Sequence, residues 1–130
     1  MIKRIIEHKH IKPILKSFVF AFSGLAHIFK NHRNARIILF IGILVLAAGV
    51  YLKLSTIEMT IIILVCGLVL IGEIFNTMLE DIVDLVTDSK FHPIAKIIKD
   101  MAAAAVLLAS FLSILVGILV FFPKLNLLWR

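Results

Sequence analysis

Three apolar runs follow one another in the chain from position 37 onward. The run 37–52 holds no charge between Arg36 and Lys53, and the run 101–123 is also uncharged. A helix needs about 20 apolar residues to cross a bilayer, and snorkelling cations can extend a slightly shorter one. The middle run, 59–72, is too short unless its helix continues through Leu79, which carries Glu73 and Asn76 to membrane depth. The pattern therefore predicts spanning helices over about 35–53, 57–86 and 93–122.

Before these runs, apolar residues recur at helical spacing between lysines. Such a pattern is typical of a helix that lies in the membrane interface. Pro13 suits a first helical turn, so the best helix is expected over about 13–29, inside an amphipathic interfacial segment 1–33. The predicted fold class is all-α integral membrane, with an N-terminal amphipathic surface helix plus three transmembrane helices in a single membrane domain, 1–130.

Composition and charge exclude a soluble globule and orient the chain. Of 130 residues, 62% are hydrophobic and the mean hydropathy is +1.10, whereas soluble domains are about 45–50% apolar. Eight basic residues precede position 37, Lys53 alone lies in the first loop, and three lysines lie in or just after the second. We therefore expect a multi-pass protein of the cytoplasmic membrane, with the N-terminus and second loop inside and the C-terminus outside. The basic segment is expected to face anionic lipid and not nucleic acid. No cleavage site follows an apolar core near the start, so no signal peptide is expected.

Acidic and amide side chains cluster in the second predicted span. At about 100° per residue, Glu73, Asn76, Glu80 and Asp84 share one helical stripe, whereas Asp81 points away from it. Carboxylates at membrane depth are costly and mark function by default. Oxygen donors of this kind are the ligands that Mg²⁺ prefers. The stripe therefore predicts a site for phosphoryl transfer.

Two lysines near the start of the third predicted span, Lys96 and Lys99, could bind a nucleotide. An alternative is that they only anchor the span at the cytoplasmic side, and that the later acids of the stripe form a solvated helix end paired with them.

Several strings carry a resemblance to a known family. They are Lys16-Ser17-Phe18 with Ala21-Phe22 and Gly24, Glu73-Ile74-Phe75-Asn76-Thr77, Glu80 with Val83-Asp84, His92-Pro93 with Ala95-Lys96, and Lys99-Asp100 followed by 102–106. Over about 16–121 the chain resembles the small prokaryotic diacylglycerol kinase and undecaprenol kinase family. No Walker-type glycine-rich loop is present, which agrees with this resemblance.

The resemblance implies a homotrimeric lipid kinase that uses ATP and Mg²⁺ to phosphorylate a membrane lipid hydroxyl. It implies that Glu73 is the catalytic base and that Glu80 is a metal ligand. Residues implied to contact the nucleotide or the active site are Asn76, Asp84, His92, Lys99 and Asp100. The acceptor is not determined by the chain, although Asn34, Arg36 and the proline after His92 look more like undecaprenol-type members.

His32 departs from the family pattern, because members carry a second metal-binding Glu at this position. A neutral imidazole suits Mn²⁺ or Zn²⁺ better than Mg²⁺. Three interpretations stay open: a kinase with a weakened or altered metal site that includes His32, a member with other phosphoryl chemistry such as lipid-phosphate hydrolysis, and a nonfunctional relative. The alternative that is not an enzyme is a non-catalytic membrane scaffold, in which the polar stripe joins packed helices.

Overall fold

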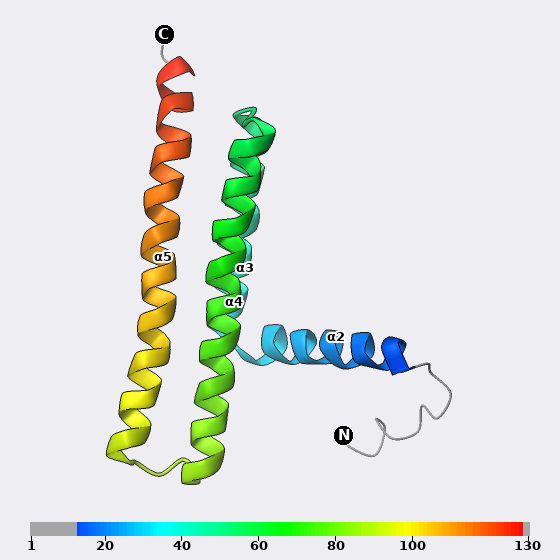
Figure 1. Cartoon of the computed structure of the whole chain (residues 1–130), viewed down its shortest axis with the longest axis vertical. Coiled ribbons are helices and arrows are strands. Elements are labelled where there is room, and N and C mark those ends of the chain that lie inside the picture. Colours follow the sequence, from blue (N-terminus) through cyan, green and yellow to red (C-terminus); the bar gives the residue numbers. More distant parts are fainter. Residues whose placement is uncertain (1–12, 129–130) are drawn as a thin grey trace. The chain divides into compact units, whose positions relative to one another are not determined.

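The computed structural model describes residues 13–128 and is helical throughout them apart from short connections (Figure 1). The helices are α2 (Pro13–Asn31), α3 (Arg33–Tyr51), α4 (Thr56–Thr87) and α5 (Pro93–Leu128). The chain divides into one unit that ends at Asn31 and a second unit that begins at His32. The prediction of an all-α fold with an N-terminal helix and three spans is confirmed. The part of the interfacial segment before position 13 lies outside the described residues.

Helix α2 forms the described part of the first unit and is amphipathic. Ile14, Phe18, Phe22 and Leu25 recur at helical spacing and are exposed, and no described residue of the unit covers them. Lys16 and Lys30 provide cations along the same helix. A helix with this distribution is suited to lie in the membrane interface, with its apolar face towards acyl chains.

The second unit is an antiparallel arrangement of α3, α4 and α5 in which α4 contacts both of the other helices (Figure 1). Its buried apolar residues are few and mostly small, with Ala35 and Ile62 nearly inaccessible and Ala102 and Ala109 also buried. Small side chains let helix backbones approach closely, which is how helices pack in a bilayer.

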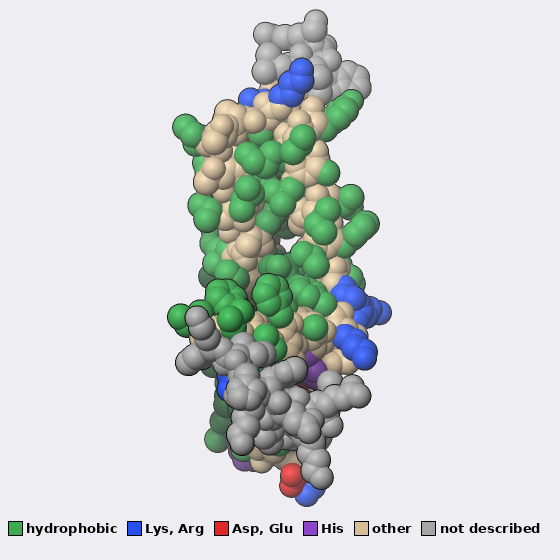
Figure 2. Space-filling view, turned by 90° about the vertical axis from the view of Figure 1, so that its right-hand side faces the viewer, with side chains coloured by type: hydrophobic (Ala, Val, Ile, Leu, Met, Phe, Trp, Pro, Cys, Tyr) green, Lys and Arg blue, Asp and Glu red, His purple; other side chains and the backbone are tan. Residues whose placement is uncertain are grey.

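The outer surface of these three helices is apolar because it faces lipid. Each helix is long and hydrophobic enough to cross a membrane, and at most 11% of each span's most apolar window is buried inside the unit. On the face shown in Figure 2, hydrophobic side chains cover the upper part of the molecule below a small group of basic residues. The chain is therefore a multi-pass membrane protein, as predicted.

Polar contacts join α4 and α5 near both ends. Helix α4 begins with a capping box in which Ser55 and Glu58 each accept the other's backbone N–H, at 3.3 and 2.7 Å. The Glu58 carboxylate also pairs with Lys124 Nζ at 3.0 Å, and at the other end Lys99 Nζ pairs with Asp84 Oδ1 at 2.6 Å. The two acids, Glu58 and Asp84, are separated by nearly as many residues on α4 as the two lysines, Lys99 and Lys124, are on α5. Together they hold one axial register of α4 against α5.

Helix α5 extends further than the expected span, through Pro123 to Leu128. Proline lacks the N–H that would bond to the carbonyl four residues earlier, so it usually ends or kinks a helix. The α5 helix nevertheless continues to Lys124, where the ion pair with Glu58 joins this turn to the start of α4.

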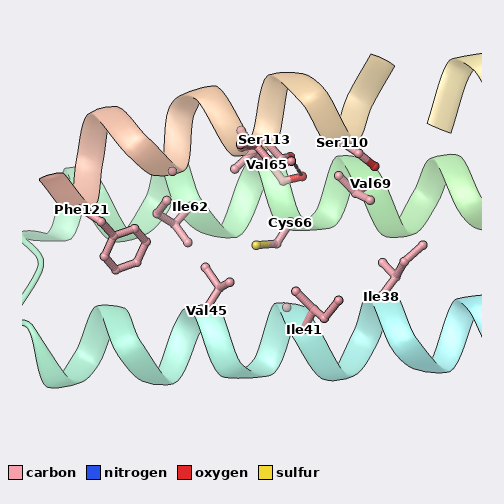
Figure 3. A pocket seen from close by; sticks show the side chains of 13 residues that line it. Ile38, Ile41, Val45, Ile62, Val65, Cys66, Val69, Ser110, Ser113 and Phe121 are labelled. Carbon is pink, nitrogen blue, oxygen red and sulfur yellow. Dashed lines mark hydrogen bonds between the residues drawn. The ribbon is translucent and has the colours of Figure 1, made fainter. Parts of the chain in front are cut away.

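A groove runs between α3 and α5 and has α4 as its floor (Figure 3). Its cavity is about 350 Å³ and is lined by side chains at positions 38–45 of α3, 62–69 of α4 and 110–121 of α5. We call this feature the interhelical groove.

The distribution of basic residues predicts the orientation of these helices. In a Cys66→Ala background, Lys53→Cys should react with a membrane-impermeant thiol reagent on intact cells, because the α3–α4 connection is expected outside. Ser89→Cys, in the α4–α5 turn, should react only after permeabilisation. Labelling of both variants from the same side would contradict three antiparallel spans.

Candidate active site

Helix α4 carries its polar side chains on one face in its second half. Glu73, Asn76 and Thr77 are buried, and the exposed fractions of Glu73 and Asn76 are 5% and 8%. Continuous helix through Gly72 determines this placement, because a bilayer requires every backbone polar group to be bonded within the helix. The residues that follow the apolar run therefore continue the same helical spacing, so the carboxylates lie along one line on the surface of α4.

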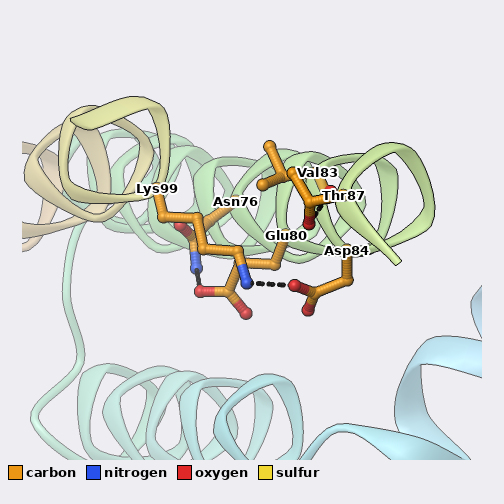
Figure 4. A network of polar contacts seen from close by, with 6 residues as sticks. All are labelled: Asn76, Glu80, Val83, Asp84, Thr87 and Lys99. Atoms are coloured by element: carbon orange, nitrogen blue, oxygen red, sulfur yellow. Dashed lines mark hydrogen bonds and ion pairs between the residues drawn. The ribbon is translucent and has the colours of Figure 1, made fainter. Parts of the chain in front are cut away.

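Figure 4 shows three members of this line, Asn76, Glu80 and Asp84, together with Lys99 of α5. Asn76 Nδ2 donates to Glu80 Oε1 at 3.1 Å. One turn further on, Asp84 Oδ1 accepts from Lys99 Nζ at 2.6 Å. Lys99 is the α5 residue that contacts the α4 stripe, and its side chain is about one-third exposed. An acidic line with one cation facing it can bind both a metal ion and phosphate oxygens.

Two oxygen groups in this site lack partners among the described residues. Asn76 Oδ1 is buried without a hydrogen bond. None of the ion pairs or hydrogen bonds found within residues 13–128 involves the Glu73 carboxylate. A buried polar atom without a partner is costly, and in native proteins it indicates a bound water, an ion or a catalytic role. Asn76 and Glu73 are therefore the atoms at which a ligand or a reacting group is expected.

His32, just before α3, lies beside the same region. Glu80 and His32 both lie near the Glu73 carboxylate. His32 Nε2 also lies 3.9 Å from Asp81 Oδ2, although the helical phase had set Asp81 apart from the stripe. Sequence reasoning missed this contact, since an acid outside the stripe acquires a partner only once α3 is packed on α4.

The structure brings together Glu73, Asn76, Glu80, Asp84 and Lys99 but leaves two predicted site residues outside the network. Asp100 is exposed and pairs with Lys96 one turn earlier on α5, at 2.6 Å. His92 caps α5, where its Nδ1 accepts from the Ile94 N–H at 3.2 Å. Of the two lysines singled out for a nucleotide, Lys99 pairs with Asp84 of the stripe, whereas Lys96 pairs with Asp100 within α5.

Comparison with known proteins identifies the family. Residues 19–121 match the family model of prokaryotic diacylglycerol kinase. The chain belongs to the prokaryotic diacylglycerol kinase family. The predicted resemblance and the prediction of a lipid kinase are confirmed at this level.

The relatives of this family member are named for two different lipid substrates, diacylglycerol and undecaprenol. It is 41% identical over 112 residues to the diacylglycerol kinase of Synechocystis sp., an alignment that covers 86% of this chain but only 64% of that protein. It is 39% identical over 120 residues to the undecaprenol kinase of Bacillus subtilis, covering 92% of this chain and 97% of the relative. The diacylglycerol kinase of Helicobacter pylori is 32% identical over 100 residues, 77% of each chain.

Two ion pairs of equal length allow a test of how the site is held together. The Lys99–Asp84 pair joins two helices and is partly shielded, whereas the Lys96–Asp100 pair lies within α5 and is well exposed. A double-mutant cycle with Asp84→Asn and Lys99→Met should give a coupling energy of about 1 kcal/mol in thermal unfolding in detergent. The matched cycle with Asp100→Asn and Lys96→Met should give about 0.3–0.5 kcal/mol, the usual range for exposed pairs one turn apart. Equal coupling energies would show that Lys99–Asp84 does not hold α5 against α4.

Proposed function

We propose that this chain transfers the γ-phosphoryl group of ATP to the hydroxyl of a membrane lipid, undecaprenol or diacylglycerol, at the cytoplasmic face and with Mg²⁺. The observation that carries the proposal is the buried, unpaired carboxylate of Glu73, on the same helix face as Asn76 and Glu80. Membership of the diacylglycerol kinase family supports the same activity.

In the proposed reaction Glu73 is the general base. The lipid hydroxyl oxygen forms a bond to the γ-phosphorus, the bond from that phosphorus to the β–γ bridging oxygen breaks, and ADP leaves. The hydroxyl proton passes to the Glu73 carboxylate. A carboxylate without a cation partner is free to accept that proton, and Glu73 directly follows the apolar run of α4, where we expect the hydroxyl of a membrane lipid to approach.

The donor set of the stripe fits a hard divalent cation. Glu80 provides a carboxylate and Asn76 Oδ1 is a buried oxygen without a partner, which is the kind of atom that a cation satisfies. We propose Glu80, Asn76 and His32 as the residues that hold the metal. Mg²⁺ bound there would offset the negative charge of the transferring phosphates.

Lys99 is the proposed phosphate contact, because it is the lysine of α5 that faces the stripe. Asp84 orients Lys99 from the opposite side. Asp100 and His92, on the exposed start of α5, are proposed to contact the parts of the nucleotide that extend towards water.

We propose a homotrimer with the N-terminus in the cytoplasm and the C-terminus outside. One unit of three helices buries few residues and leaves the Glu80 and Lys99 side chains partly open, so a neighbouring copy would complete the enclosure of the site.

Replacement of the proposed base tests the function directly. With labelled ATP and vesicles that contain undecaprenol or diacylglycerol, Glu73→Gln should lower lipid phosphorylation about 10²- to 10⁴-fold, the usual contribution of a general base. Asp88→Asn is the matched control, because it makes the same carboxylate-to-amide change at the exposed C-cap of α4, where asparagine tolerates the left-handed backbone conformation. Equal labelling with Glu73→Gln and wild type would refute the assignment of Glu73.

His32 tests the metal site. If the site is that of a kinase with one carboxylate missing, His32→Glu should increase phosphorylation and lower the Mg²⁺ concentration needed by roughly 10- to 150-fold, about the effect of one charged ligand. Asn34→Glu is the control, because it adds the same charge at a nearby exposed position of α3. Activity is measured against Mg²⁺, Mn²⁺ and Zn²⁺ concentrations.

Other outcomes of that titration discriminate between the remaining interpretations. Better activity of the wild type with Mn²⁺ or Zn²⁺, lost in His32→Glu, would show that the imidazole is a ligand in its own right. No change with any metal would show that position 32 is outside the metal site.

A further inference from the structure

Asp81 is a carboxylate that the proposed chemistry does not use, and it lies beside His32. Both residues belong to the second unit, His32 directly before α3 and Asp81 on α4. His32 is the N-cap of α3, but its side chain makes no capping hydrogen bond. Helices usually begin with Ser, Thr, Asp or Asn, whose side chains accept from the first N–H groups of the helix. The imidazole therefore does not cap α3, and its Nε2 lies close to α4 instead.

The distance between the two side chains is closer to that between two ligands of one metal ion than to that of a hydrogen bond. His32 Nε2 and Asp81 Oδ2 are 3.9 Å apart, whereas N–H···O hydrogen bonds are about 2.7–3.2 Å long. Imidazole nitrogen and carboxylate oxygen both bind Zn²⁺ at about 2.0–2.2 Å, so two ligand atoms of a tetrahedral ion lie about 3.4 Å apart. A small rotation of the Asp81 side chain is sufficient to close the difference.

An ion can reach this pair from water. The side chain of Asp81 is 57% exposed and that of His32 is 25% exposed. Water molecules can therefore supply the remaining ligands of a tetrahedral ion, as they do at zinc sites that keep an open position. An ion bound here would link the residue before α3 to the polar half of α4.

The ligand types select the metal. Imidazole is a good ligand for Zn²⁺ and related transition metals, whereas Mg²⁺ prefers carboxylate, carbonyl and water oxygens. Glu80 and Asn76, on the stripe, offer oxygen atoms to a metal ion. The second unit thus holds oxygen donors suited to Mg²⁺ and, in His32 and Asp81, a nitrogen and oxygen pair suited to Zn²⁺.

We propose that His32 Nε2 and Asp81 Oδ2 bind one Zn²⁺ ion, and that this ion inhibits the enzyme. The binding stands on the contact itself, whereas the inhibition rests on the proposed kinase function, in which His32 helps to hold Mg²⁺. Zn²⁺ shared with Asp81 keeps the imidazole turned to that carboxylate. His32 also lies near Glu73, so the ion places two positive charges where they repel a second divalent cation.

Zinc binding is measured first, without ATP or lipid, so that no turnover is needed. The full-length protein in detergent is titrated with Zn²⁺ against a chromophoric chelator. Asp81→Asn and His32→Ala should each weaken the binding of one Zn²⁺ per chain by at least about tenfold. Loss of a carboxylate that only orients a ligating histidine already weakens metal binding about 10- to 100-fold, and loss of a ligand should cost no less.

Two further variants separate a metal ligand from an ordinary contact between side chains. Asp81→His replaces one zinc ligand by another and should retain the ion, although it removes the carboxylate that attracts His32. Asp88→Asn is the matched control for Asp81→Asn, because it makes the same change at the exposed C-cap of the same helix. It should leave zinc binding unchanged.

Inhibition is measured with labelled ATP, Mg²⁺ and vesicles that contain undecaprenol or diacylglycerol, at buffered concentrations of free Zn²⁺. Asp81→Asn should keep wild-type activity without Zn²⁺ and should need at least about tenfold more free Zn²⁺ for half inhibition. Zn²⁺ that acted by replacing Mg²⁺ at Glu80 and Asn76 would instead inhibit the wild type and Asp81→Asn at the same concentration.

Each outcome decides the proposal. Equal zinc binding by the wild type, Asp81→Asn and His32→Ala would overturn the site, and so would an equal loss in Asp88→Asn. Equal inhibition of the wild type and Asp81→Asn, or higher activity with Zn²⁺ in place of Mg²⁺, would overturn the inhibitory role. Zinc binding that depends on Asp81, without any ATP-dependent phosphorylation, would contradict the proposed kinase and support the zinc site.

Discussion

The absence of water in the bilayer core is the constraint on which this structure depends. Backbone polar groups there must be bonded within the chain, so α4 continues as one helix from Thr56 to Thr87 although its uncharged run ends at Gly72. Because the helix does not break, Glu73 and Asn76 are carried into its buried face. Because it costs free energy to place such polar groups at membrane depth, we interpret this face of α4 as functional.

Helix α4 is central to the packing of the second unit and to the candidate active site. It contacts α3 and α5, forms the floor of the interhelical groove and carries the polar stripe. One helix face thus changes from apolar to polar within a single turn, between Val69 and Glu73. A substrate with a long apolar chain and one hydroxyl has the same division.

The contacts between α4 and α5 hold this division in place. The pairs Glu58–Lys124 and Asp84–Lys99 lie near opposite ends, with the Ser113 to Val65 hydrogen bond between them. In lipid, apolar packing alone distinguishes poorly between neighbouring registers, because a slipped helix still faces hydrocarbon. Polar contacts of this kind set the level at which Lys99 meets the α4 stripe.

The sequence by itself determined the helices, the three spans and the alignment of Glu73, Asn76, Glu80 and Asp84. These follow from the length of apolar runs and the helical period, which are local properties of the chain. The family was also recognisable from motif residues alone. The continuation of α5 through Pro123 was not, since the Lys124 contact with Glu58 involves a residue far away in the chain.

Only the tertiary structure decided which side chains meet. Position near the start of the third span left Lys96 and Lys99 as equal candidates, and only the family resemblance favoured Lys99, but the structure pairs Lys99 with Asp84 and Lys96 with Asp100. The approach of His32 to Asp81, the unsatisfied oxygen of Asn76 and the interhelical groove have the same origin. Each depends on the rotation and axial offset of one helix against another, and periodicity within a helix carries no information about either.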